Sequence, residues 1–189
     1  MTIETQQLEG RDHWVCPVVL VVEGVLHGSQ GPMFYGADVL RASARAWNGR
    51  PVVVYHPTMY GHSFADSPEV FNKQKIGVLF NTRFDHRRLK AEAWLDQERV
   101  RTVDLRVHNA ILKQRPMEVS TGLIAFADDD SSGTWNGVPY QKTLTGMLPD
   151  HLAILPDQEG ACSIEDGAGL MMNVRVNAIE PLLMPVMVW

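Results

Sequence analysis

The sequence predicts an α+β fold that is mainly β, in the form of a β-barrel surrounded by α-helices. Short apolar runs rich in Val and Ile recur along the chain, and their lengths favour strands over helices. Only two stretches carry helical periodicity, and they do not alternate with the strands as a doubly wound parallel sheet requires. The predicted buried strands are residues 18–22, 52–55, 76–80, 119–126 and 152–155.

Two hairpins extend this pattern. Apolar and polar residues alternate from Arg88 to Leu95, which is typical of a half-solvated strand. The preceding Asp85-His86 pair suits a turn back from residues 76–80. Acidic, Ser and Gly residues cluster over 128–137 and predict a second turn before a strand at 138–140.

The helices are expected at 38–47 and from Asp96 to about residue 111. Asp38 is a candidate N-cap for the first, which Asn48-Gly49 would end. Asp96 is the candidate N-cap of the second, whose apolar residues fall on one face until Pro116 ends the helix. We therefore expect two amphipathic helices packed on the outside of the barrel.

Composition excludes several classes of protein. The 189 residues include 17 Lys and Arg against 22 Asp and Glu, a net charge of −5, and 45% are hydrophobic. A globular domain of this kind buries a core without disulfides, and it has no general attraction for phosphate backbones, so nucleic acid is not an expected partner. The polar, acidic N-terminus does not resemble a secretory signal, and no apolar stretch approaches the roughly 20 residues that span a bilayer, so no membrane is expected.

The organisation predicted is an N-terminal segment 1–15, a domain over 16–177 and a C-terminal segment 178–189. The last segment is apolar and rich in Pro and Met, and is either a packed strand or a linker. Only two cysteines occur, Cys16 and Cys162, without a C-x-x-C motif, and they are expected to be reduced and buried.

Three segments place a reactive side chain in or at the end of an apolar strand. They contain His56, which precedes Pro57, then Ser120 within Glu118-Val-Ser-Thr-Gly122, and His151 within Pro149-Asp-His-Leu-Ala. Strand alternation turns Ser120 away from its packed neighbours and towards a cleft. A serine hydroxyl becomes a nucleophile when an imidazole accepts its proton and a third group orients that imidazole. A Ser-His-His triad is therefore one interpretation, although a serine and two histidines occur in most chains of this size.

No cofactor or metal is expected. The chain lacks G-x-G-x-x-G, a P-loop and H-E-x-x-H. His56, His62 and Asp66 form an alternative, metal-binding set, but nothing in their spacing makes them converge. His56 is preferred to His62 as the base because it ends a strand and is held by Pro57, whereas His62 follows a glycine in a loop.

Together, these motifs resemble the phage prohead proteases related to herpesvirus assemblin. The resemblance lies in His56-Pro57 after an apolar strand, in the strand Val119-Ser120-Thr121-Gly122, and in the run from His151 through Gly160 to Cys162. It covers roughly residues 18–176. Each motif is short, and the specificity comes from their order and spacing.

The resemblance implies a serine endopeptidase that cleaves capsid scaffold, and often itself, inside the immature capsid in the host cytoplasm. By this resemblance Ser120 is the nucleophile, His56 the general base and His151 the orienting third member. The implied partners are the scaffold and major capsid proteins, and relatives are activated by dimerisation, so self-association is expected. The family fold is a barrel surrounded by helices, in agreement with the pattern above.

The chain departs from the family after the last histidine. Relatives carry arginines that support an oxyanion hole, whereas this chain has Asp157-Gln-Glu-Gly160-Ala161. The oxyanion hole would then come from the backbone N–H groups of Gly160 and Ala161. Two alternatives stay open, an inactive assembly or scaffold-associated protein of the same fold and a metal-dependent hydrolase.

Overall fold

The computed structural model describes residues 3–57 and 64–172. His62 and the predicted C-terminal segment 178–189 lie outside the described residues. The elements in chain order are β1 (Glu4–Leu8), β2 (Arg11–Val22), β3 (Gly24–Gly28), β4 (Gly31–Tyr35), α1 (Ala37–Ser43), the 3₁₀ helix η1 (Ala44–Trp47), β5 (Pro51–Val54), α2 (Pro68–Lys73), β6 (Lys75–Asp85), β7 (Arg88–Asp96), α3 (Gln97–Val103), α4 (Leu105–Leu112), β8 (Glu118–Asp128), β9 (Gly133–Trp135), β10 (Val138–Tyr140), β11 (Lys142–Leu155) and β12 (Gly169–Leu170).

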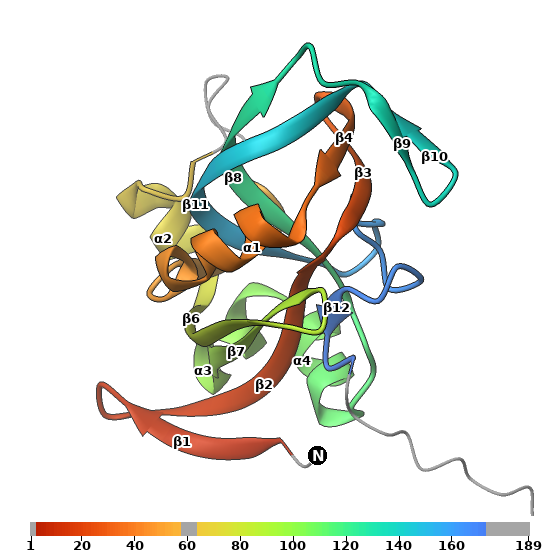
Figure 1. The fold of residues 1–189 in the computed structure, drawn as a ribbon. Helices are drawn as coiled ribbons and strands as arrows, with labels where there is room; N and C mark the ends of the chain where they lie inside the picture. The colour runs from red at the N-terminus through yellow and green to blue at the C-terminus, as the bar shows by residue number, and fades with distance from the viewer. Residues whose placement is uncertain (1–2, 58–63, 173–189) are drawn as a thin grey trace, which may run out of the picture.

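The chain has an α+β fold that is mainly β and is built on one large mixed sheet (Figure 1). Its strands follow the order β1-β2-β7-β6-β5-β11-β4-β3, with β8 paired to β11 and β12 paired to β2. Most pairs are antiparallel, but β11 runs parallel to both β4 and β5. Each predicted strand and the hairpin between β6 and β7 are present, because the alternating and apolar runs match the pleat of the strands that they form. The second hairpin is formed by β9 and β10 and has a shorter turn than predicted, because residues 133–135 are already in β9.

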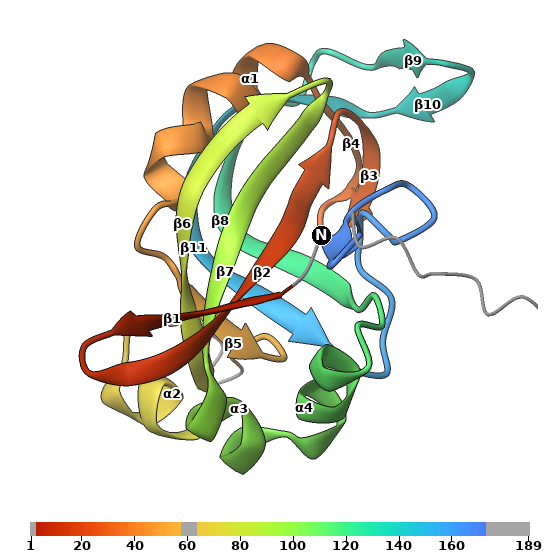
Figure 2. The same ribbon diagram turned by 90° about the horizontal axis from the view of Figure 1, so that it is seen from below.

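The sheet folds over a single main core. Figure 2 shows β2, β6 and β7 on one side, with β8 and β11 crossing behind them and α3 and α4 at one end. Side chains of both groups of strands, such as Val19, Leu79 and Ile154, are completely buried together. At the edge of this arrangement β12 pairs with β2, and Leu170 of β12 exchanges two backbone hydrogen bonds with Met117, immediately before β8.

Cys16 and Cys162 are free and buried, as expected from the sequence.

The long helix predicted from Asp96 is divided in two. Asp96 is the N-cap of α3, as predicted, but the chain becomes extended at Asp104 (φ −154°, ψ 113°), whose carboxylate then caps α4 by accepting the N–H groups of Arg106 and Val107. An aspartate side chain competes for backbone donors and so favours a helix start over a helix interior.

The first predicted helix also differs at its start. Gly36, and not Asp38, is the N-cap of α1, and Asp38 lies in the first turn, where it pairs with Arg41. Within the described residues, no helix is long and apolar enough to cross a bilayer.

Candidate active site

The position of His56 is set by the residue before it. β5 ends at Val54, and Tyr55 adopts a left-handed backbone conformation (φ 61°) that is uncommon for a non-glycine residue. Its N–H donates to the carbonyl of Ile154 on β11 (3.0 Å), and its hydroxyl donates to Asp157 (2.7 Å). Tyr55 is therefore held at both ends, and the chain turns His56 out of the β5 strand direction.

His56 and His151 meet although they are 95 residues apart in sequence. The Nδ1 atom of His56 lies 2.7 Å from Nε2 of His151, and the two rings meet edge to face at 70°. His151 is completely buried, whereas His56 is half-buried. The parallel pairing of β5 with β11, which places Val54 opposite Ile154, brings the end of β5 next to the segment of β11 that contains His151.

A bulge in β11 gives His151 a second partner. Pro149 lies opposite Leu123 and His151 lies opposite Gly122, so Asp150 is the extra residue between two paired positions. Its Oδ2 atom lies 2.6 Å from Nδ1 of His151. In a regular strand Asp150 would point to the opposite face from His151, but this alternation fails at the bulge.

Ser120 lies on the same face of the sheet as His151. In the antiparallel pair β8 and β11, Gly122 is opposite His151 and Ser120 is opposite Ala153, so the four share one face. This face is the outer one, because Val119 and Ile154, which alternate with them, belong to the main core. Two strand residues span about 7 Å, so the Cα positions of Ser120 and His151 are separated by one strand repeat along this face. Within the described part of the chain its hydroxyl makes no hydrogen bond.

Gly122 makes room for the ring of His151. A Cβ atom at this position would lie 2.0 Å from Cε1 of His151 and 2.4 Å from each ring nitrogen. Any side chain here would displace the imidazole. A glycine in a strand interior is a signal for such a close approach, and the sequence contained that signal.

Gly160 reaches the start of β8. A Cβ atom on Gly160 would lie 2.2 Å from the carbonyl oxygen of Val119, next to Ser120. Its N–H donates to Glu118 Oε2 (3.3 Å), and Ile164 N–H donates to Oε1 of the same carboxylate (3.0 Å). Ala161 is exposed, and among the described residues its N–H has no hydrogen-bond partner. Of the two candidate oxyanion donors, Gly160 is thus already bonded to Glu118.

Both histidines are held neutral at neutral pH. Burial lowers the pKa of His56 to about 4, and the adjacent charge that His151 carries when protonated lowers it further. Burial also lowers the pKa of His151, and the hydrogen bond that His151 donates to Asp150 partly offsets that effect. A neutral imidazole has one nitrogen that accepts a hydrogen, which a general base requires.

A pocket of 510 Å³ opens beside Ser120 on the same face. Glu118 and Leu155, which are paired across the two strands, line it together with Pro156, Asp157 and Glu159. Glu118 and Leu155 lie two residues along the strands from the Ser120 and Ala153 pair. A substrate peptide bound at Ser120 would therefore have this pocket next to it.

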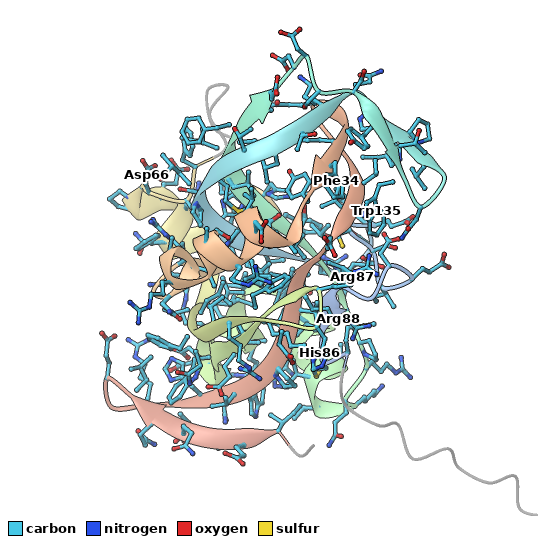
Figure 3. The ribbon with its side chains drawn as sticks, viewed as in Figure 1. Phe34, Asp66, His86, Arg87, Arg88 and Trp135 are labelled. Atoms are coloured by element: carbon cyan, nitrogen blue, oxygen red, sulfur yellow. The ribbon has the colours of Figure 1, made fainter. Side chains whose placement is uncertain are left out.

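A second pocket, of 370 Å³, lies elsewhere. Figure 3 shows its residues His86, Arg87, Arg88 and Trp135 on the side of the molecule opposite Asp66, which follows Ala65 near the histidine pair. The second pocket is therefore separate from the candidate site.

The structure describes only part of the alternative metal-binding set of His56, His62 and Asp66. Asp66 is exposed, and His62 lies outside the described residues. Over residues 3–57 and 64–172, no three His, Cys, Asp or Glu side chains converge as metal ligands.

No family model, no curated protein and no solved structure matches this chain. The function proposed below is therefore supported by the geometry of its own side chains and by the sequence resemblance.

Proposed function

We propose that the chain is a serine endopeptidase of the kind that matures phage capsids, with Ser120 as nucleophile and His56 as general base. The observation that carries the proposal is the 2.7 Å contact between His56 and His151, on the sheet face that Ser120 shares with His151. Three short motifs chosen from the sequence for their chemistry lie on adjoining strands. This arrangement supports a Ser-His-His triad in which the two histidines are already in contact.

The reaction follows from these positions. Ser120 Oγ attacks the scissile carbonyl carbon while its proton moves to His56 Nε2, and the carbonyl oxygen becomes an oxyanion. The C–N bond then breaks, the leaving amine takes the proton from His56, and an acyl-serine remains. Water attacks that ester with His56 again as base, which releases the carboxylate product and restores Ser120.

The oxyanion requires donors that are aimed at it in advance. Ala161 N–H is the available backbone donor of the pair expected from the sequence. The N–H group of Gly160 can act as a second donor to the oxyanion only if its 3.3 Å hydrogen bond to Glu118 breaks.

The fold that accompanies this function is a β-barrel with helices around it, as in assemblin. The pairings that support it run from β2 through β7, β6, β5 and β11 to β8. The two hydrogen bonds between Met117 and Leu170, followed by the pairing of β12 with β2, lead back to the starting strand.

The biological setting is proposed from the resemblance alone. The substrate is the capsid scaffold protein, with the chain itself as a second substrate, and the site of action is the inside of the immature capsid in the host cytoplasm. The major capsid protein is the other partner, and self-association accompanies activity.

The decisive experiment incubates the chain with the capsid scaffold protein of the same virus and identifies fragments by mass spectrometry. Wild-type protein should cleave the scaffold, and Ser120→Ala should lower the rate by roughly 10⁴-fold or more. Ser132→Ala, which makes the same change in an exposed turn, is the matched control and should leave the rate unchanged. A fluorophosphonate probe should label Ser120 in the wild type. Cleavage by Ser120→Ala within a few-fold of the wild-type rate rules out the nucleophile.

A non-catalytic assembly protein is the second candidate. The bond between Gly160 N–H and Glu118 favours it, because that bond occupies one of the two expected oxyanion donors. It predicts scaffold binding without fragments and without labelling of Ser120. Adding EDTA separates the metal-dependent alternative, since a serine peptidase keeps its rate when metal is removed.

A further inference from the structure

Asp150 joins the histidine pair through a single oxygen. Its Oδ2 lies 2.6 Å from His151 Nδ1 and also accepts the backbone N–H of Ala65 at 2.7 Å. His151 in turn lies 2.7 Å from His56. Asp150, His151 and His56 thus form one continuous chain of hydrogen bonds that ends at the half-buried ring of His56.

The proton positions along this chain follow from the atoms that it contains. An ionised aspartate has no hydrogen to donate, so the hydrogen of the first bond is on His151 Nδ1. A neutral His151 then has a lone pair on Nε2, and the hydrogen of the second bond must come from His56 Nδ1. The remaining nitrogen, His56 Nε2, is left with its lone pair, as a base for a hydroxyl proton requires.

The opposite order would disable the base. If His151 carried its hydrogen on Nε2 and donated it to His56 Nδ1, a neutral His56 would carry its own hydrogen on Nε2. That nitrogen could not then accept a proton from Ser120. The contact between the two histidines permits either order, and only the neighbour of His151 Nδ1 selects between them.

We propose that Asp150 is a positioning residue that fixes the tautomers of both histidines and so directs the lone pair of His56 Nε2 outward. The bulge at Pro149 turns its side chain towards His151, and Ala65 N–H holds the accepting oxygen in place. His151 is completely buried, and among the described residues Asp150 is the partner of its Nδ1 atom. The effect of Asp150 on the cleavage rate rests on the proposed peptidase function, whereas its effect on the tautomers of the two histidines does not.

Two substitutions separate the accepting oxygen of Asp150 from its charge. Asp150→Asn keeps an oxygen that can accept both hydrogen bonds, and Asp150→Ala removes the oxygen. Long-range ¹H–¹⁵N spectra of the full chain at neutral pH report which ring nitrogen carries the hydrogen. We expect His56 and His151 to be Nδ1–H tautomers in the wild type and in Asp150→Asn, and mixed tautomers in Asp150→Ala. Asp38→Asn, a change at an exposed helix position, is the control and should leave both rings unchanged.

The kinetic measurement then uses the same proteins with the scaffold substrate. We expect kcat to fall by roughly 10²-fold in Asp150→Ala and by a smaller factor in Asp150→Asn, with KM unchanged. A wild-type spectrum with the hydrogen of His151 on Nε2 overturns the proposal whether or not the variants fold. The expected tautomers in a protein that does not cleave scaffold would refute the peptidase function and leave the role of Asp150 standing.

Discussion

The dipeptide Asp-His occurs three times in this chain, at 12–13, 85–86 and 150–151, in three different settings. In the regular strand β2, Asp12 is exposed and His13 is buried, where its Nδ1 lies 3.0 Å from the carbonyl of Arg11. At the turn between β6 and β7 the two side chains do contact each other, but the side chain of His86 is 92% exposed. Only at the third position are the two side chains in contact and the histidine completely buried.

The difference comes from the backbone and from the residue opposite. A regular strand sends neighbours to opposite faces, as at the first dipeptide, and a turn leaves both in water, as at the second. The bulge in β11 places both side chains on one side, and Gly122 on β8 leaves a space for the ring. Contact between the two side chains of an Asp-His dipeptide is therefore not distinctive by itself. The third dipeptide differs because its histidine is buried against a second histidine.

The largest expected effect distinguishes the second dipeptide from the third. His56→Ala should lower the rate of scaffold cleavage by roughly 10⁴-fold or more, because in the proposed mechanism it removes the base that takes the proton of Ser120. His86→Ala, in the exposed turn shown in Figure 3, should leave the rate unchanged. The measurement is kcat/KM on the scaffold protein. Equal losses in the two variants would mean that the buried pair has no special role.

The next effect ranks the members of the pair. His151→Ala should lower kcat by roughly 10² to 10³-fold, less than His56→Ala, because His151 orients the base and does not itself take the proton. Single-turnover kinetics on both variants give the comparison. If the two losses are equal, His151 takes part in proton transfer directly, and if His151→Ala has no effect, it does not belong to the site.

Most strands could be predicted from the sequence, because alternating or continuous apolar residues are typical of strands. The candidate pair His56 and His151 was also visible, because each follows or lies in such a strand. The role of Asp150 was not predicted, since the alternation rule that located the strands assigns it to the wrong face. Pro149 within the strand was the available signal for a bulge. The break at Asp104 was missed in the same way, because a regular apolar pattern continues through a residue that caps a new helix.

Gly122 offers a test of the space that the third dipeptide needs. Gly122→Ala places a Cβ atom within 2.0 Å of the His151 ring and should displace it, which destabilises the fold by about 1–3 kcal/mol and lowers kcat. Gly28→Ala in β3 is the matched control, because nothing lies within 4 Å of its Cβ position. Urea denaturation gives the free energies of unfolding. A Gly122→Ala protein as stable and active as Gly28→Ala would show that the ring is not confined by β8.

The smallest expected effect is a pH dependence that is displaced from that of an ordinary histidine. The base must be neutral to accept a proton, and burial lowers the pKa of His56 from 6.5 to about 4. Its neutral form is therefore complete at neutral pH and is lost only as the pH falls through about 4. Scaffold cleavage should keep nearly the same kcat/KM from pH 7.5 down to about pH 5, reach half of it near pH 4, and fall by about tenfold per pH unit below that. The folded state should lose stability earlier, as the pH falls from about 6.5 to about 4, because over that range the unfolded chain binds a proton at His56 that the folded chain does not. The measurements are initial rates and urea midpoints at each pH. A loss of activity with a midpoint near 6.5 would show that the base is solvated and not enclosed beside His151.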